Sequence, residues 1–289
     1  MGPIRIAVLA ATGLATAASA QLDPPAWTQA AAPFHVVGPI WYVGSQGLAA
    51  YLVKTRSGAI LIDGTMAQNV PAIERNIQAE GVALRDVRLL LNSHAHFDHA
   101  AGLAQLKKDT GARLVAGVGD RAALDSGIPP GEVSYGVIRF PAVRVDRAVR
   151  EGERVTLGGM TGGGVTLTAH ATPGHTPGNT TWSMRVVEGG RPLDVVFAGS
   201  LTVAGNRLVG NRRYPGIVGD FRRSFARMAA LHADVVLPMH PETADVMGRA
   251  ARVRAGEAGA FVAPGLLARM VAEARTAFEV ELAKQQAAR

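Results

Sequence analysis

The sequence predicts an α/β fold that forms one domain over residues 21–289. Short apolar runs typical of buried strands recur in both halves of the chain, and helical patterns accompany them in each half. No linker or low-complexity segment separates the two halves. Length alone would also allow two smaller domains, but 289 residues that are 48% hydrophobic can form one substantial core.

The first twenty residues differ from the rest of the chain. One charged residue, Arg5, precedes the apolar run 6–11, and small residues continue to Ala18-Ser19-Ala20. This order is typical of a secretory signal peptide with an A-x-A-like cleavage site. We therefore expect residues 1–20 to be a signal peptide that is cleaved before Gln21, and the mature protein to be periplasmic. The alternative is a buried N-terminal helix.

Strand and helix boundaries in the first half follow from breaks in the apolar pattern. Gly44-Ser45-Gln46-Gly47 separates two strand-like runs and predicts a hairpin. A continuous apolar run, Arg88-Leu89-Leu90-Leu91, predicts a buried strand that stops at Asn92-Ser93. We predict strands at 34–43, 48–54, 59–64 and 88–91, and a helix at 70–81.

The second half repeats this organisation without repeating the sequence. We predict strands at 165–171, 193–197 and 235–237, and helices at 219–231 and 266–286. Each predicted strand ends at a polar, glycine-rich or proline-rich segment. Binding sites in α/β sheets tend to form where strands end, so these segments are candidates for the functional site.

Composition restricts the possible functions. The chain has no cysteine, so a metal must be held by nitrogen and oxygen atoms rather than by thiolates. The formal charge is +7, or +6 once Arg5 is removed, and only 5% of residues are aromatic. No recognition module for nucleic acid is present, and no later segment has the ~18 uninterrupted apolar residues of a membrane span. We expect a monomer that neither binds nucleic acid nor spans a membrane.

A cluster of metal-binding residue types follows the strand at 88–91. The segment His94-Ala95-His96-Phe97-Asp98-His99 holds three of the eight histidines. Alternating residues point the same way, so His94 and His96 can serve one ion while Asp98 and His99 project toward a neighbouring position. Imidazole and carboxylate ligands suit zinc, or less selectively iron and manganese. The alternative is a chance cluster on a solvated loop.

Two more histidines lie at predicted strand ends between glycine and proline residues. His175 lies in Pro-Gly-His-Thr-Pro-Gly and His240 in Pro-Met-His-Pro. Such framing fixes the backbone direction and lets a ligand approach closely. Each alone could be structural, but metal ligands are scattered in sequence and grouped in space, so both become candidate ligands. We assign no role to His35, His170 and His232.

These segments, together with Gly174-His175-Thr176-Pro177-Gly178 and Ala198-Gly199-Ser200, resemble the metallo-β-lactamase superfamily over nearly the whole mature chain. The resemblance implies a four-layered αβ/βα sandwich with two zinc ions at one edge of the sheets. It also implies that Asp98 orients the nucleophile. The implied ligands are His94, His96 and His175 for the first zinc, and Asp98, His99 and His240 for the second.

Ser200 discriminates among members of that superfamily. Thioesterases, lactonases and nucleases of this fold usually carry a bridging aspartate at the corresponding strand end, and two β-lactamase subclasses carry a cysteine. A serine hydroxyl is a poor zinc ligand, and its presence together with His99 resembles subclass B3. The segments 200–202, 210–215 and 221–226 resemble that subclass too, but the cysteine that several members have near 231–234 is absent.

The resemblance implies a zinc β-lactamase. Its substrates would be penicillins, cephalosporins and carbapenems, attacked by a metal-bridging hydroxide, and its effect would be antibiotic resistance. Ser200 and Thr202 would bind the substrate carboxylate, although both can equally be plain strand-end hydroxyls. The alternatives are a lactonase or thioesterase of the same fold, or a non-catalytic periplasmic zinc-binding protein.

Overall fold

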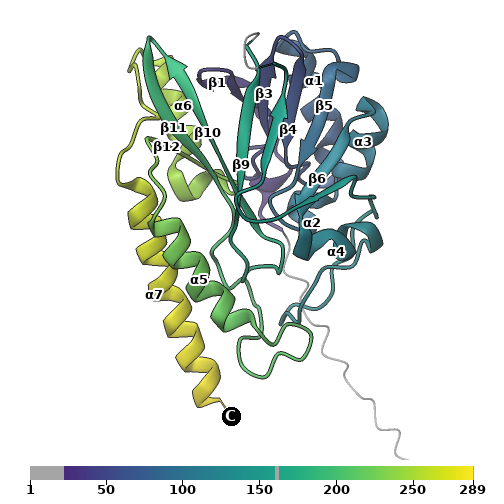
Figure 1. Ribbon diagram of the computed structural model, residues 1–289, viewed down its shortest axis with the longest axis vertical. Helices are drawn as coiled ribbons and strands as arrows, with labels where there is room; N and C mark the ends of the chain where they lie inside the picture. The colour runs from purple at the N-terminus through teal and green to yellow at the C-terminus, as the bar shows by residue number, and fades with distance from the viewer. Residues whose placement is uncertain (1–22, 160–162, 289) are drawn as a thin grey trace, which may run out of the picture.

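The computed structural model describes residues 23–159 and 163–288. Two β-sheets pack face to face and helices cover both outer faces, which gives the four layers expected of the αβ/βα sandwich (Figure 1). That prediction is therefore confirmed. The predicted signal peptide and its cleavage site lie outside the described residues.

The strands of the described part form two sheets. The first sheet has the order β1 (Phe34–Val37), β2 (Ile40–Tyr42), β3 (Tyr51–Thr55), β4 (Gly58–Ile62), β5 (Val87–Leu91), β6 (Arg113–Gly117) and β7 (Arg147–Val149). The second has the order β12 (Val235–Pro238), β11 (Arg191–Ala198), β10 (Thr180–Glu188), β9 (Val165–Ala171) and β8 (Arg154–Leu157).

Helices occupy the outer layers (Figure 1). The α-helices are α1 (Val70–Ala79), α2 (Phe97–Ala100), α3 (Leu103–Thr110), α4 (Arg121–Ser126), α5 (Ile217–Ala229), α6 (Val246–Arg254) and α7 (Leu266–Ala287). Short 3-10 helices are η1 (Pro25–Trp27), η2 (Ala67–Asn69), η3 (Leu84–Asp86), η4 (Val118–Asp120) and η5 (Pro241–Ala244). In the residues that the structure describes, none of these helices combines the length and apolarity needed to cross a membrane.

Alternation along the central strands explains the layers. Successive side chains of a strand point to opposite faces, so a strand buried on both sides reads as a continuous apolar run. In β4, Ile60 and Ile62 pack between the sheets, whereas Leu61 packs toward α1 and α3. In β11, Phe197 faces the space between the sheets and Val196 faces α5 and α7. Each sheet is thus buried on both faces.

The element predictions are confirmed to within a few residues, with one exception. The run 34–43 is predicted as one strand, but it forms the antiparallel pair β1 and β2. The chain turns at Gly38, whose φ of +54° favours glycine, and Pro39 follows. The hairpin predicted around Gly44–Gly47 joins β2 to β3, although the second strand begins at Tyr51 rather than at residue 48.

Strand direction brings the candidate segments to one edge of the sandwich. In the first sheet β4, β5 and β6 run parallel, so their carboxyl ends lie side by side. In the second sheet β11 and β12 run parallel, and β9 has the same direction because it and β11 are both antiparallel to β10. The loops that follow these six strands meet where the two sheets adjoin, and polar contacts join them to one another.

Candidate metal centre

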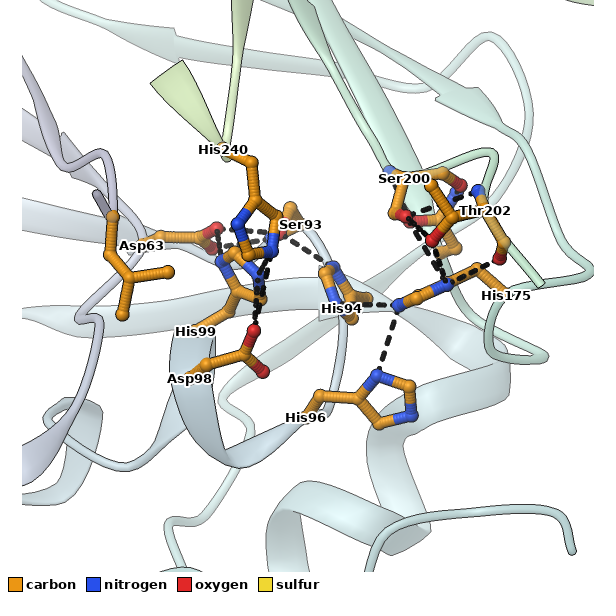
Figure 2. Close-up of polar contacts among 12 residues, drawn as sticks. Asp63, Ser93, His94, His96, Asp98, His99, His175, Ser200, Thr202 and His240 are labelled. Carbon is orange, nitrogen blue, oxygen red and sulfur yellow. Dashed lines mark hydrogen bonds and ion pairs between the residues drawn. The ribbon is translucent and has the colours of Figure 1, made fainter. Parts of the chain in front are cut away.

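The six predicted ligands lie together at this edge (Figure 2). One stretch supplies four of them: the loop after β5 and the single turn of α2, which begins at Phe97. The loops after β9 and β12 supply the other two. All are buried except His240, which is half-buried. The side chains are His94, His96, Asp98, His99, His175 and His240.

Three imidazoles form a first group. His175 Nε2 lies 3.1 Å from His94 Nε2 and 3.0 Å from His96 Nδ1. Burial lowers the pKa of His96 to about 4 and lowers the pKa of His94 and His175 well below the ordinary value. All three rings are therefore neutral at neutral pH, and each can present a nitrogen lone pair. Three converging imidazole nitrogens are a ligand set that zinc favours.

Hydrogen bonds at the outer nitrogens orient two of these rings. His175 Nδ1 donates to the backbone oxygen of Thr202 at 2.8 Å. His94 Nδ1 lies 3.0 Å from Ser93 Oγ. With the proton held on Nδ1, the lone pair of each ring lies on Nε2, the atom that faces the other histidines.

A second group contains one carboxylate and two imidazoles. Asp98 Oδ2 lies 3.2 Å from His99 Nε2 and 3.3 Å from His240 Nε2, and these two nitrogens are 3.2 Å apart. Burial opposes ionisation of Asp98, but the neighbouring His99 and His240 hold its pKa well below the usual range. The same burial opposes charge on His99, yet the carboxylates of Asp98 and Asp63 raise its pKa to about 10. The surroundings of this group thus favour positive charge.

The two groups adjoin one another. Ligand atoms of His94, Asp98 and His99 also lie within 4.8 Å of one another, as do those of His94, His96 and His175. His94 is therefore common to both sets of close neighbours. Neutral nitrogens in one group and an anionic carboxylate in the other fit a pair of divalent cations, with nitrogen and oxygen ligands as the composition requires.

Asp63 and Ser93 support the ligands, and the sequence prediction did not assign them. Asp63 follows β4 and is fully buried with φ +62°. Its Oδ2 accepts a 2.5 Å hydrogen bond from Ser93 Oγ and lies 3.3 Å from His99 Nδ1, in an ion-pair contact rather than a hydrogen bond. Its Oδ1 accepts from the Ser93 backbone N–H at 2.7 Å. A polar residue directly after a buried strand was the available indication.

Hydroxyls and one aromatic ring flank the ligands. Ser200 Oγ lies 3.1 Å from Thr202 Oγ1 and 3.2 Å from His175 Nδ1, the nitrogen that faces away from the other imidazoles (Figure 2). Thr202 is exposed and Ser200 is half-buried, so an incoming molecule can reach both. Trp27 of η1 contacts His240, with its ring centroid 5.5 Å from that of His240.

The three remaining histidines lie elsewhere and have local partners. His35 Nε2 bonds to the backbone oxygen of Gly38 at 2.8 Å, and His170 Nε2 bonds to Ser183 Oγ at 2.8 Å. His232 is exposed and lies 3.6 Å from Asp234. His232 also lies with Asp194 and Asp234 in a surface group whose ligand atoms are within 4.8 Å of one another. That these three histidines have no role stays a prediction.

Known proteins resemble the chain in both sequence and structure. Residues 48–240 match the Metallo-beta-lactamase superfamily. BJP-1, a subclass B3 metallo-β-lactamase of Bradyrhizobium japonicum, is 45% identical, with 91% of this chain and 98% of that chain covered and a TM-score of 0.85. A metallo-β-lactamase of Cronobacter sakazakii is 40% identical over 91% and 98% of the two chains, with a TM-score of 0.83. A hydroxyacylglutathione hydrolase of Rhodospirillum rubrum is 26% identical over 74% of each sequence.

Proposed function

The chain belongs to the metallo-β-lactamase superfamily and is most like its subclass B3, and on that premise we propose that it is a zinc-dependent β-lactamase. Its reaction is hydrolysis of the strained amide of the β-lactam ring in penicillins, cephalosporins and carbapenems, and its effect is antibiotic resistance. A superfamily alone does not fix a reaction, so the proposal depends on the geometry of the site.

The proposal depends chiefly on the side chain that follows β11, Ser200. Thioesterases and lactonases of this fold usually place a metal-bridging aspartate there, and this chain has Ser200. Its hydroxyl lies beside Thr202 Oγ1 and the outer nitrogen of His175. The second group instead draws on His99, whose Nε2 faces Asp98 and His240. This arrangement favours a subclass B3 β-lactamase over the thioester hydrolase that the more distant relative represents.

Two zinc ions are the cofactor that this ligand set fits. His94, His96 and His175 would hold the first, and Asp98, His99 and His240 the second. Bound zinc supplies Lewis acidity and lowers the pKa of water from 15.7 to roughly 7, so a nucleophile is available at neutral pH.

The residues of the chain then bind and orient the reactants. Asp98 remains an anion because its pKa is held well below the usual range, so it can accept a hydrogen bond from the attacking water and orient it. Ser200 and Thr202 offer two adjacent hydroxyls to the substrate carboxylate. The ring of Trp27 packs against His240, where it would keep bulk water from that side of the ligand.

We also propose that the enzyme acts in the periplasm as a monomer. The order of charge, apolar run and small residues over 1–20 supports export, and N-terminal sequencing of exported protein should find Gln21 first. A mature protein that begins at Met1 would contradict this part of the proposal.

The deciding experiment compares three substrate classes with one preparation. Zinc-loaded mature protein is assayed against a carbapenem, a lactone and a glutathione thioester, with and without excess chelator. We expect chelator-sensitive turnover of the carbapenem at the highest kcat/KM. Preferred hydrolysis of the lactone or thioester would contradict a β-lactamase. Bound zinc without turnover of any substrate would indicate a non-catalytic zinc-binding protein.

A further inference from the structure

Asp120 is a fully buried carboxylate close to the metal centre that the proposed chemistry does not use. It ends η4, directly after β6. Its Oδ2 accepts hydrogen bonds from the Ala95 backbone N–H at 2.9 Å and from Thr176 Oγ1 at 2.6 Å. Its Oδ1 accepts from the Gly178 backbone N–H at 2.8 Å. A buried carboxylate is costly unless it is hydrogen-bonded, and here three donors satisfy it.

The three donors belong to the two loops that carry the first group of imidazoles. Ala95 lies between His94 and His96, whereas Thr176 directly follows His175. The carboxylate of Asp120 therefore ties the loop after β5, in the first sheet, to the loop after β9, in the second. Across that junction, His175 Nε2 lies 3.1 Å from His94 Nε2 and 3.0 Å from His96 Nδ1.

Backbone packing gives this carboxylate a fixed position. A Cβ added at Gly119 would lie 2.3 Å from the backbone oxygen of Pro177, and one added at Gly178 would lie 2.2 Å from the backbone nitrogen of Asp120. Such distances are too short for any side chain, so only glycine permits the two segments to approach this closely. Asp120 is thus held against the His175 loop by main chain on both sides.

We propose that Asp120 is a positioning residue for the first metal group, because it sets the separation of the His94–His96 loop from the His175 loop. The inference rests on the proposed function only in that these three histidines bind zinc. A rigid support matters because metal ligands must be held close to one geometry, and loss of such outer partners typically weakens metal binding.

The substitution Asp120→Asn tests this with little change in shape. An amide has one acceptor oxygen, so its NH₂ group must face either Gly178 N–H or Ala95 N–H. At that position the hydrogen bond to the loop is lost, because two N–H donors then face each other. Thr176→Val is a milder variant that removes only the hydroxyl donor, and Thr176→Ser restores it. Asp125→Asn is the matched control, since Asp125 accepts from the Val145 backbone N–H at 2.8 Å on nearby α4.

The measurement is stepwise zinc affinity by competition with a chelator, together with the unfolding temperature of each full-length mature protein. We expect Asp120→Asn to weaken the first zinc about 10- to 100-fold. Thr176→Val should lose less affinity for the first zinc, and Thr176→Ser should keep that affinity. Asp125→Asn should bind zinc as the unaltered protein does. If Asp120→Asn does not fold, the pair of Thr176 variants decides.

Unchanged zinc affinity in folded Asp120→Asn, or in Thr176→Val, would overturn the inference, even if the unfolding temperature falls. That outcome would leave Asp120 with a general role in stability. Failure of the proposed function has a different signature: the unaltered protein would bind zinc without hydrolysing a β-lactam, and the affinity comparison would still decide the role of Asp120.

Discussion

Asp63 Oδ2 lies 3.3 Å from His99 Nδ1, on the side of the imidazole ring opposite the nitrogen that faces Asp98 and His240. The same oxygen accepts from Ser93 Oγ, which in turn lies 3.0 Å from His94 Nδ1. One buried carboxylate thus acts on one ring of each metal group. When such a ring is neutral, as a metal ligand must be, the carboxylate favours the tautomer whose proton is on Nδ1 and whose Nε2 lone pair faces inward.

We expect Asp63→Asn to weaken zinc binding about 10- to 100-fold. Asparagine tolerates the positive φ of this position, so the backbone can remain as it is. If its oxygen keeps the bond to the Ser93 N–H, its NH₂ group faces His99 Nδ1 and places the ring proton on Nε2, where a metal must bind. Chelator competition measures the affinity. Zinc affinity equal to that of the unaltered protein would show that Asp63 does not set the tautomer.

The two groups should respond separately to loss of one ligand. We expect His240→Ala to lose mainly the second zinc, because only Asp98 and His99 remain in that group. His175→Ala should damage the first zinc, since His175 Nε2 lies within 3.1 Å of both His94 and His96. Zinc stoichiometry after gel filtration distinguishes the outcomes, with exposed His232→Ala as the control. Loss of both ions from His240→Ala would contradict two separable sites.

The candidate ligands of the metal centre can be picked out in the sequence because their residue types are chemically distinctive. Histidines are few, no cysteine competes with them, and apolar runs mark the strands that precede them. The strand ends therefore group His94 with His240, although 145 positions separate them in the chain. The α/β fold class can also be predicted, because strands buried on both faces appear in the sequence as continuous apolar runs.

The roles of the supporting residues cannot be predicted in this way, although their places after apolar strands can be seen. Asp63 and Asp120 are ordinary aspartates in sequence, and their roles depend on which loops adjoin across the two sheets. Strand β10 has alternating polar residues and escapes prediction, although it lies in the centre of the second sheet. The turn at Gly38 is missed because the residues on both sides are apolar.

Ser200→Ala should keep both zinc ions and raise the KM for β-lactams. A hydrogen bond to a charged carboxylate contributes about 1.5–3 kcal/mol, or roughly 10- to 150-fold in affinity. Steady-state kinetics and zinc stoichiometry measure the two effects. The control is Ser126→Ala, because Ser126 Oγ donates to a backbone oxygen within α4. If Ser200→Ala loses a zinc, the serine is a ligand and the assignment to subclass B3 chemistry fails.

Glu74 on α1 carries a carboxyl group whose charge destabilises the fold. Burial, together with the carboxyl group of Asp109 on α3, raises the pKa of Glu74 to about 6. Its Oε1 is buried without a hydrogen-bond partner in the described structure. Because the folded state holds this proton more tightly than the unfolded state does, stability falls as the pH rises from 4.5 through about 6.

We therefore expect Glu74→Gln to be more stable than the unaltered protein above the raised pKa, and the difference to shrink as the pH falls toward 4.5. Glutamine keeps the shape and removes the charge, so the cost of ionising a partly buried group beside Asp109 disappears. Chemical unfolding of both proteins at about pH 5 and about pH 8, in the same zinc concentration, gives the difference at each pH. The metal centre is common to both proteins, so its own pH dependence cancels. Glu273→Gln, at an exposed position of α7, controls for the loss of one carboxylate. A stability difference for Glu74→Gln that is equal at both pH values would contradict the raised pKa.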